Sequence, residues 1–266
     1  MPERILLTGA AGKIGTMLRS RLARPDRVLR LLDLAPQEPA AAGERVELVT
    51  ASITDLPAMC TASKDVDAVI HMGGISGEDS WSKILDVNIN GTHAVLDAAR
   101  RAGVGRVILA SSNHAVGFAP LDGGTVPDGL LPRPDTYYGV SKAAMEALGS
   151  LYHDRYGLDV IAIRIGACRE RPTDSRELSI WLSPDDCARL LEAAISVPRP
   201  GFRLIWGVSA NTRGFVSLAE AEAIGYQPQD DAEAFAGDVK PAGELARKFV
   251  GGRFCSPAND DVEAST

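Results

Sequence analysis

Short apolar runs alternate with longer amphipathic stretches along most of this chain. Short apolar runs bounded by polar or turn residues are typical of buried strands in a parallel sheet. The amphipathic stretches between them are typical of helices that cover both faces of such a sheet. The pattern therefore predicts an α/β fold with a doubly wound parallel sheet. Its strands are expected at residues 4–8, 28–32, 46–49, 68–71, 107–110, 160–165 and 203–206.

Helices are expected between these strands, at residues 12–22, 81–101 and 136–156. A later helix has a clear start, with Ser183 as the N-cap, Pro184 at the first helical position, and Asp185 and Asp186 in the first turn. The last residues, 259–266, are polar and are expected to fray.

Composition and charge narrow the class of function. The 266 residues are 45% hydrophobic and 24% charged, which are ordinary values for a globular protein. A net charge of −7 argues against a broad nucleic-acid surface and leaves no basic membrane patch. An anionic substrate would therefore need a local arginine.

The four cysteines are widely spaced, with no Cys-x-x-Cys pair, so the sequence indicates neither a zinc site nor a disulfide framework. Free thiols in a reducing compartment are the preferred interpretation. The N-terminal residues run straight into the first predicted strand, and no apolar run reaches the length of a membrane span. We therefore expect a cytoplasmic protein.

A glycine-rich segment, residues 9–15, follows the first predicted strand and opens the first predicted helix. Glycines allow a tight turn and a close backbone approach to a pyrophosphate, which then lies at the helix N-terminus. The spacing is Gly-x-x-Gly-x-x-Gly, and its place in the chain is that of the dinucleotide site of a Rossmann fold. The expected cofactor contacts here are Gly9, Gly12, Lys13, Ile14 and Gly15.

Asp33 stands at the end of the second predicted strand, where a carboxylate accepts hydrogen bonds from both ribose hydroxyls and repels a 2′-phosphate. No arginine follows it immediately, so the sequence favours NAD over NADP. His71 is interpreted as a buried histidine with satisfied hydrogen bonds, and Asn88 as a residue that orders the site through the backbone. Further cofactor contacts are expected from Ser52, Ile53, Met72, Gly73, Gly74 and Asn88.

Tyr138 and Lys142 are four residues apart on a predicted helix, so their side chains share one face. A fixed ammonium beside a phenol favours the phenolate and lowers its pKa, so that tyrosine can act as a general base. The spacing alone is common, but here it follows a strand ending in Ser111-Ser112 and a glycine-rich strand-turn-helix. The three features in this order predict a nicotinamide-dependent dehydrogenase.

The chain as a whole suits one Rossmann-type domain over residues 1–266. Residues 1–165 are expected to bind mainly the cofactor, and residues 166–266 to form a small C-terminal substrate-binding portion. Within the latter, residues 169–179 are charged and irregular. Ligands of doubly wound folds lie beyond the carboxyl ends of the strands, so this segment is either a substrate flap or a solvated loop.

Together these motifs resemble the extended subgroup of the short-chain dehydrogenase/reductase superfamily, which is NAD-dependent epimerase/dehydratase-like. The resemblance covers nearly the whole chain. Local strings narrow it to the uronate dehydrogenase family, whose members oxidise C1 of glucuronate or galacturonate with NAD to an aldarolactone. Those strings are residues 71–76, 111–114, 164–166, 181–186 and 207–211.

The resemblance implies Tyr138 as the base and Lys142 as its partner, with a cofactor contact near Cys168. Ser112 and Asn113 are alternatives for the group that polarises the reacting oxygen. At position 167 this chain has alanine where the family has a serine that touches substrate, so we expect one weakened sugar contact. The implied substrate contacts are Ser76, Ser112, Asn113, His114, Tyr138 and Arg176.

Arg176 is expected to hold the substrate carboxylate, because a guanidinium fork matches a carboxylate in shape and charge. Arg169 and Arg171 in the same segment compete for this role, and Glu170 and Glu177 could instead pair with the arginines. His114 is interpreted either as a hydrogen-bond donor to sugar hydroxyls or as a capping residue in a turn.

Two other functions remain open on the sequence. A nucleotide-sugar epimerase or dehydratase shares the cofactor motif and the Tyr/Lys pair, but needs a larger C-terminal region. A catalytically idle NAD-binding regulator typically loses the tyrosine or the lysine, and both are present. A homo-oligomer is expected from the resemblance, and a helix face with Ala143, Ala144, Ala147, Leu148 and Leu151 could pack against a partner or against the protein's own sheet.

Overall fold

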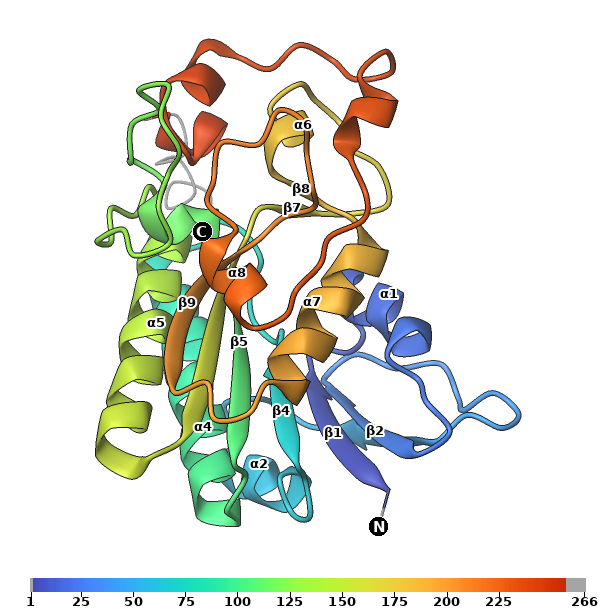
Figure 1. Cartoon of the computed structure of the whole chain (residues 1–266). Helices are drawn as coiled ribbons and strands as arrows, with labels where there is room; N and C mark the ends of the chain where they lie inside the picture. Colours follow the sequence, from blue (N-terminus) through green and yellow to red (C-terminus); the bar gives the residue numbers. More distant parts are fainter. Residues whose placement is uncertain (1, 257–266) are drawn as a thin grey trace.

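A computed structural model describes residues 2–256 and places seven strands in one parallel sheet (Figure 1). Their order across the sheet is β3-β2-β1-β4-β5-β6-β9, so the winding direction reverses between β1 and β4. This is the doubly wound Rossmann arrangement, with its ligand crevice at the reversal. The strands are β1 (Glu3–Thr8), β2 (Arg27–Asp33), β3 (Val46–Thr50), β4 (Ala68–His71), β5 (Arg106–Ser112), β6 (Asp159–Ile165) and β9 (Phe202–Gly207).

The seven predicted strands are confirmed, and most extend one or two residues beyond the apolar run that predicted them. The added residues are polar in several cases, as at Arg27, Asp33 and Ser112. Backbone pairing with the neighbouring strand continues past the apolar core, so β5 stays paired with β6 through Ser112. Hydrophobicity alone does not mark these ends, since the ladder depends on the backbone.

Three predicted helices are confirmed as α1 (Lys13–Arg21), α5 (Tyr137–Tyr156) and α7 (Pro184–Ser196). The α7 cap is as predicted, because the Ser183 hydroxyl accepts a hydrogen bond of 2.9 Å from the amide of Asp186. Shorter elements give weak periodic signals and were not predicted. These are α2 (Leu56–Ala62), β7 (Ala167–Cys168), α6 (Glu177–Ile180), β8 (Trp181–Leu182), α8 (Ala219–Ala223) and four 3₁₀ turns, η2 (Asn113–Val116), η3 (Ala232–Phe235), η4 (Glu244–Arg247) and η5 (Gly252–Cys255).

The single helix predicted at residues 81–101 consists of three segments. A short α3 (Trp81–Lys83) leads into a π-helix, η1 (Ile84–Asn90), which continues as α4 (Gly91–Ala102). A π-helical turn is wider than an α turn and often occurs at functional sites. Here it carries Asn88, whose side chain reaches a loop and a second helix, as described below.

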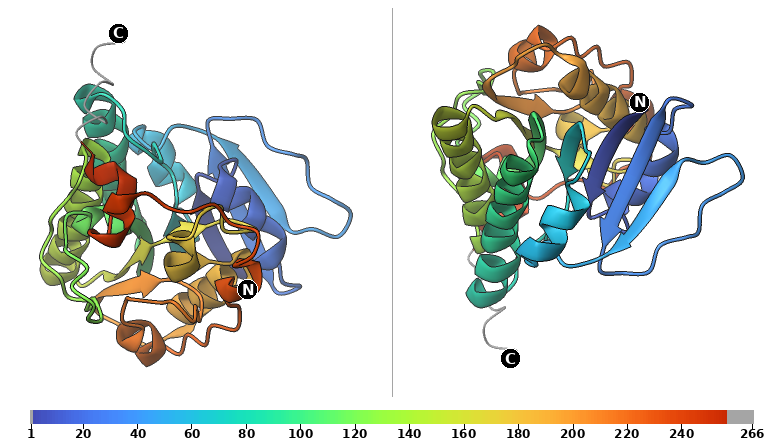
Figure 2. Two further views of the ribbon diagram at one scale, coloured as in Figure 1. Left: turned by 90° about the horizontal axis from the view of Figure 1, so that it is seen from above. Right: turned by 90° about the horizontal axis from the view of Figure 1, so that it is seen from below.

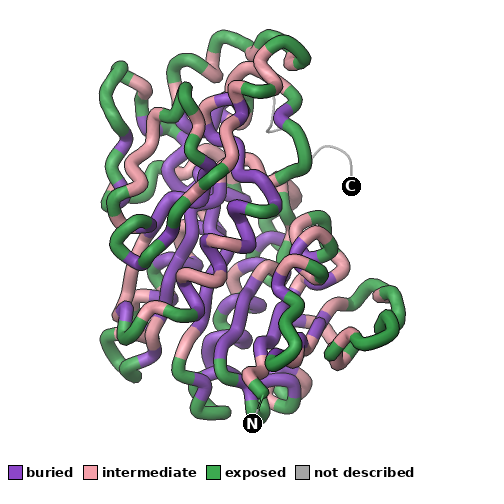
Figure 3. The backbone as a smooth tube through the Cα atoms, turned by 45° about the vertical axis from the view of Figure 1, so that its right-hand side comes forward, coloured by how far each residue is buried: buried purple, intermediate pink, exposed green. Residues whose placement is uncertain are grey.

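Two apolar clusters lie on opposite faces of the sheet. One cluster packs one face of the sheet against α1, α7 and α8, and includes Leu18, Leu190 and Ala221. The other joins the opposite face to α2, α4 and α5, and includes Met59, Leu96 and Met145. Figure 2 shows the sheet between these two helical layers, and Figure 3 shows the buried strands surrounded by exposed loops.

The C-terminal residues return to cover the carboxyl ends of the strands. In Figure 1 the last described segment lies above the sheet, next to the connection that follows β5. The amide of Val250 donates to the Ala119 carbonyl at 3.0 Å, and that of Gly251 donates to the Gly117 carbonyl at 2.8 Å. These backbone bonds attach residues 250–251 to the segment between β5 and α5.

Exposure separates the residues of the α5 face into covered and uncovered ones. Residues of α5 that point to the sheet include Met145, Gly149 and Tyr152, which are buried. Leu148 packs against the protein's own core, whereas Ala147 and Leu151 are exposed, so the protein's own sheet covers only part of the face. Within residues 2–256, no helix combines the length and the apolar character that a membrane span requires.

Candidate active site

A cleft of about 1370 Å³ opens at the carboxyl ends of the strands, where the winding direction reverses. This volume exceeds that of a typical small-molecule pocket, about 300–1,000 Å³. It is lined by the glycine-rich segment, the ends of β2 to β5, the start of α5, the segment after β6, and the C-terminal residues. Every predicted site residue lines it except Asn88.

The glycine-rich segment forms a cradle in which side chains have no room. Gly9 has φ +71°, and a Cβ there would lie 2.7 Å from the amide nitrogen of Gly73. A Cβ on Gly15 would lie 2.3 Å from the carbonyl oxygen of Gly9. Backbone packed this closely, at the start of α1, fits the pyrophosphate of a dinucleotide as the sequence predicts.

Asp33 links the glycine-rich segment to the turn after β2. One carboxylate oxygen accepts from the amide of Ala11 at 2.9 Å, and the other accepts from the amide of Ala35 at 3.0 Å. Each oxygen keeps a further lone pair, and the residue lines the cleft. Asp33 is therefore held at the edge of the cleft with acceptor capacity for a ribose diol.

Asn88 orders the site from outside the cleft. Its side-chain oxygen accepts from the amide of Ile75 at 2.8 Å, and its nitrogen donates to the Ile75 carbonyl and the Ser141 hydroxyl, each at 3.0 Å. The Ser141 hydroxyl in turn donates to the carbonyl of Tyr138 at 2.7 Å. The predicted ordering role matches this geometry. The predicted direct cofactor contact does not, because these bonds occupy the side chain and Asn88 is not in the lining.

His71 is buried at the end of β4 and is neutral. Its two ring nitrogens lie 2.8 Å from the Thr8 hydroxyl and 3.3 Å from the Thr92 hydroxyl. Burial, and then the nearby charge of Lys142, lower the pKa of His71 to about 3. Both nitrogens have partners, so the interpretation as a satisfied buried histidine is confirmed.

Tyr138 and Lys142 lie together in the first turns of α5, and both line the cleft. The Lys142 ammonium is 5.4 Å from the centroid of the Tyr138 ring and donates to the Ala110 carbonyl at 2.7 Å. The helix begins cleanly because the Thr136 hydroxyl accepts from the amide of Gly139 at 3.0 Å. The Ala110 carbonyl thus ties the lysine of α5 to the end of β5.

In the protein without cofactor, burial outweighs every influence that lowers the pKa of Tyr138, so the lowering expected from Lys142 and the nicotinamide ring together stays a prediction for the NAD complex. Burial raises the pKa of Tyr138 to about 12, a hydrogen bond with Ser112 opposes this, and the charge of Asp135 adds to it. Burial also lowers the pKa of Lys142 to about 8, against the attraction of Glu146. Desolvation by burial disfavours the charged form of each residue and is the largest cause of both shifts.

Ser112 and Asn113 differ in how much of their hydrogen-bonding capacity is used. The Asn113 nitrogen donates to the Val250 carbonyl at 3.3 Å, and its oxygen is 3.4 Å from the Ser112 hydroxyl. The Ser112 hydroxyl accepts from the amide of His114 at 3.2 Å and is the side chain that interacts with Tyr138. Ser112 is therefore the closer of the two to the phenol, and it is also the cap of η2. His114 does not have the capping role.

Arg176 is half-buried in the wall of the cleft, with only part of its guanidinium used. Its Nη2 donates to the Val250 carbonyl, and its Nε is buried with no partner among the described residues. Burial lowers its pKa, while Asp174 and Glu177 oppose this. An unpaired buried donor costs about 1–3 kcal/mol, so the site is suited to an anionic acceptor.

The two competing arginines have other partners. The Arg169 guanidinium pairs with Glu177 at 3.2 Å. Arg171 lies over the ring of Phe235, 5.1 Å from its centroid, and is not part of the cleft lining. Glu177 also accepts from the amide of Thr173 at 2.7 Å, so its carboxylate is occupied.

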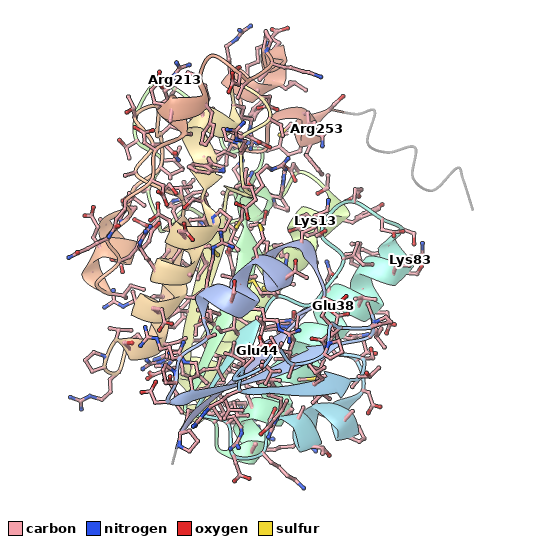
Figure 4. All side chains as sticks on the ribbon, turned by 90° about the vertical axis from the view of Figure 1, so that its right-hand side faces the viewer. Lys13, Glu38, Glu44, Lys83, Arg213 and Arg253 are labelled. Atoms are coloured by element: carbon pink, nitrogen blue, oxygen red, sulfur yellow. The ribbon has the colours of Figure 1, made fainter. Side chains whose placement is uncertain are left out.

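Two contributions to the site were missed by sequence reasoning. The C-terminal residues 241–246, Arg253, Phe254 and Ser256 line the cleft, and Figure 4 shows Arg253 above Lys13 on the same side of the molecule. Glu78 accepts from the amides of Tyr137 and Tyr138 at 3.1 and 2.9 Å, which joins the loop of Ser76 to the start of α5. Neither carries a motif, although the glycine pair 251–252 marks an unusual backbone there.

Comparison with known proteins gives one consistent result. The NAD dependent epimerase/dehydratase family model matches residues 5–168. A uronate dehydrogenase of Pseudomonas putida is 41% identical over 95% of both chains. An NAD-dependent glucose-6-phosphate dehydrogenase of Haloferax volcanii is 34% identical over 92% of this chain and all of its own length.

A solved structure of a uronate dehydrogenase from Agrobacterium tumefaciens, a tyrosine-to-alanine mutant complexed with NAD, has the same fold. Its TM-score is 0.89 at 36% identity, covering 96% of this chain and 97% of that one. The glycine cradle and Asp33 fit the same cofactor, so NAD is the cofactor of this chain. Sequence, cleft and relatives agree that this chain belongs to the uronate dehydrogenases of the NAD-dependent epimerase/dehydratase family, and is an NAD-dependent dehydrogenase that acts on a CH–OH group.

Proposed function

We propose that this protein oxidises the C1 hemiacetal of a hexuronate, D-glucuronate and/or D-galacturonate, to the aldarolactone. In this proposal Tyr138 is the general base and Arg176 holds the substrate carboxylate. The observation that carries it is the buried, half-used guanidinium of Arg176 in the wall that also contains Tyr138. The relatives named as uronate dehydrogenases support the choice of substrate.

The carboxylate contact follows from the donors that Arg176 has left. Val250 uses Nη2, and Glu177, the nearest competing carboxylate in sequence, is used by Arg169 and Thr173. A substrate carboxylate would accept hydrogen bonds from the remaining N–H groups of Arg176. Its negative charge would replace the water that the guanidinium loses on burial. A charge-assisted hydrogen bond of this kind contributes about 1.5–3 kcal/mol.

The proton of the anomeric hydroxyl passes to Tyr138, while Ser112 donates a hydrogen bond to the same oxygen. Bound NAD supplies the hydride acceptor for C1. Oxidation of a cyclic hemiacetal gives the lactone directly, so no water enters the chemical step. Because burial holds the Tyr138 pKa near 12, the phenol needs nearby positive charge to act as a base, and the charged form of Lys142 supplies part of it.

Asn113 acts differently in this proposal. Its amide nitrogen is committed to Val250, so we assign it to shaping the cleft, and we assign polarisation of the reacting oxygen to Ser112. Ser76, His114 and Cys168 complete the lining around the sugar and the nicotinamide.

The test is an NADH absorbance assay at 340 nm with glucuronate, galacturonate, glucose, galactose and glucose 6-phosphate. We expect turnover of the uronates, little with the neutral sugars, and a loss of about 10- to 100-fold in kcat/KM for uronates in Arg176→Ala. Arg171→Ala is the matched control, because this arginine is outside the cleft lining. Equal activity on neutral sugars would remove the carboxylate assignment.

Preference for glucose 6-phosphate would instead indicate that Arg176 binds a phosphate, as the Haloferax volcanii relative's name suggests for that protein. Absence of activity on all five sugars, with NAD retained after purification, would favour a nucleotide-sugar epimerase or dehydratase.

We also propose a cytoplasmic homo-oligomer. Ala147 and Leu151 expose an apolar strip on α5, and Leu151 is 47% exposed. All four cysteines are free thiols, as expected in a reducing compartment. Sedimentation of the protein with and without Leu151→Lys measures the assembly, and a monomer in both cases would contradict it.

A further inference from the structure

His114 and Asp135 form a buried pair beside Tyr138. The Nδ1 atom of His114 is 2.7 Å from a carboxylate oxygen of Asp135, whose other oxygen accepts from the Thr136 hydroxyl at 3.1 Å. The Asp135 side chain is fully buried, and His114 lies between it and the cleft. The two residues are 21 positions apart and share no sequence motif.

The Asp135 carboxylate packs closely against three glycines from different segments. A Cβ on Gly117 or Gly251 would come within 1.9 Å of its carboxylate, and a Cβ on Gly139 within 3.0 Å. Any side chain at the first two positions would displace the carboxylate from His114. The surrounding backbone is therefore shaped to hold a carboxylate-sized group at this point.

The His114 ring is fixed by its aromatic neighbours as well. Its centroid is 5.8 Å from that of Tyr138, edge to face, and 4.2 Å from that of Phe254. Its Nε2 makes no hydrogen bond with the residues between 2 and 256. One nitrogen thus faces Asp135, and the other remains for a ligand in the cleft.

Helix capping does not account for Asp135. The Thr136 hydroxyl caps α5 through the amide of Gly139, and Glu78 accepts from the amides of Tyr137 and Tyr138. The first amides of the helix therefore have partners without Asp135. Its carboxylate interacts instead with His114 and the Thr136 hydroxyl.

We infer that Asp135 is a positioning residue that keeps a ring proton of His114 on Nδ1, which in the tautomer with one ring proton leaves Nε2 to accept a hydrogen bond from a hydroxyl of the sugar substrate. A carboxylate can only accept from the ring, and the hydrogen bond at one nitrogen fixes the state of the other. This reverses the direction expected from sequence, where His114 is a donor. The inference rests on the proposed function, because it takes a sugar hydroxyl as the partner.

With Nε2 as an acceptor, His114 would select among substrates by whether they carry a hydroxyl at the position that it contacts. An acceptor in a buried wall favours a substrate with a donor at that position and disfavours an analogue that lacks it, because the buried atom is then left unpaired. The matching probe is a uronate deoxygenated at one ring position at a time. The analogue that loses activity in the wild type identifies the hydroxyl that contacts His114.

The direct test is ¹⁵N NMR of the protein labelled at histidine, with NAD bound. The chain has four histidines, and His114→Gln identifies the His114 signals by their loss. We expect a protonated Nδ1 and an unprotonated Nε2 for His114 in the wild type. An Nε2-protonated ring in the wild type would overturn the inference without any further variant.

The functional test is Asp135→Asn, which keeps the size of the group but can donate to Nδ1 and move the ring proton to Nε2. We expect the tautomer to switch, NAD binding and the melting temperature to stay near wild type, and kcat/KM for uronate to fall about 10- to 100-fold. In a His114→Gln background the same substitution should cost less than about twofold, since Asp135 acts through His114.

A full additional loss in that background, or an unchanged tautomer in Asp135→Asn, would overturn the inference and leave Asp135 as a structural residue. Failure of the proposed function gives a different result, because the wild type would then be inactive on uronates while the NMR signals still report the tautomer. If Asp135→Asn does not fold, the wild-type spectrum and the deoxy analogues still decide the question.

Discussion

The two sides of the cleft are built from different parts of the chain. The cofactor side, residues 9–15, 33, 52–53 and 72–74, is mainly backbone packed against backbone, with Lys13 and Asp33 as its charged side chains. The proposed substrate side, residues 76, 112–114, 176, 241–246, 253, 254 and 256, mixes polar and apolar residues, and two of its polar side chains, Asn113 and Arg176, donate to the Val250 carbonyl. Tyr138 and Lys142 stand between them.

This difference determines how each side tolerates change. A cradle of backbone atoms excludes an added Cβ at Gly9 and Gly15, and each of its contacts is made by backbone that any sequence supplies. The substrate side depends on three segments meeting at one carbonyl oxygen. Specificity can therefore change by substitution on the substrate side, while the cofactor side is restricted to glycine at its tightest points.

The largest effect is expected where the two sides meet. Tyr138→Phe removes the hydroxyl that accepts the proton and should lower kcat about 10²- to 10⁴-fold with little change in NAD affinity. Steady-state kinetics with uronate and fluorescence titration with NADH measure the two effects. Tyr137→Phe on the same turn is the control, because its side chain is exposed. A kcat within threefold of wild type would exclude Tyr138 as the base.

Next in size is a change confined to the cofactor side. Gly15→Ala places a Cβ 2.3 Å from the Gly9 carbonyl oxygen, so backbone must move and the NAD dissociation constant should rise about 100-fold. Gly105→Ala, where a Cβ meets nothing within 4 Å, is the control. Isothermal titration with NAD measures both, and wild-type affinity in Gly15→Ala would mean that the cradle adjusts.

The corresponding change on the substrate side is Gly252→Ala. Gly252 has φ +62°, and a Cβ there would lie 2.6 Å from the Nε of Arg176, so KM for uronate should rise about tenfold while KM for NAD stays constant. Gly157→Ala has a similar φ of +71° but open space, and it separates backbone strain from the contact with Arg176. A parallel rise in both KM values would show that the sides are not independent.

The smallest effect is on stability. The buried Lys142 has its pKa lowered to about 8, so folding is penalised below pH 8 and the penalty is relieved as pH rises toward its unfolded value near 10.5. Lys142→Met removes a penalty of about 3 kcal/mol but also the bond to Ala110, about 1–2 kcal/mol. We expect the variant to be about 1 kcal/mol more stable at pH 7, with the difference shrinking above pH 8.

Urea unfolding at pH 7 and pH 9.5 measures this difference. A gap between variant and wild type that widens with pH would contradict the assigned direction of the Lys142 pKa. Activity is lost in the variant either way, so the comparison uses unfolding free energies alone.

The cofactor side could be predicted from sequence because its signals are local. Gly9, Gly12 and Gly15 lie within one turn that joins a strand to a helix, and Asp33 follows from the next strand end. The Tyr138 and Lys142 pair is likewise a single helical spacing. The raised pKa of Tyr138 could not be predicted, since it arises from burial by segments that no local pattern reports.

The substrate side could be predicted only through the family resemblance. Arg176 bonds to a carbonyl 74 residues later, and Asn113 to the same carbonyl 137 residues later. Val250 accepts these hydrogen bonds through its backbone carbonyl, so the type of residue at position 250 does not indicate the interaction. The position of Asn88 outside the cleft could not be predicted either. Asn88 lies in a π-helical turn, whereas the periodicity of its segment indicates one continuous helix.

The use of Val250 also bears on how the enzyme matures during translation. All seven strands of the sheet and the glycine-rich segment precede residue 208, whereas the carbonyl that holds Arg176 and Asn113 belongs to residue 250 and is made later. N-terminal parts of a chain generally fold first as it leaves the ribosome. A chain that has emerged only through β9 thus contains every residue of its dinucleotide cradle but lacks the carbonyl that holds Arg176 and Asn113.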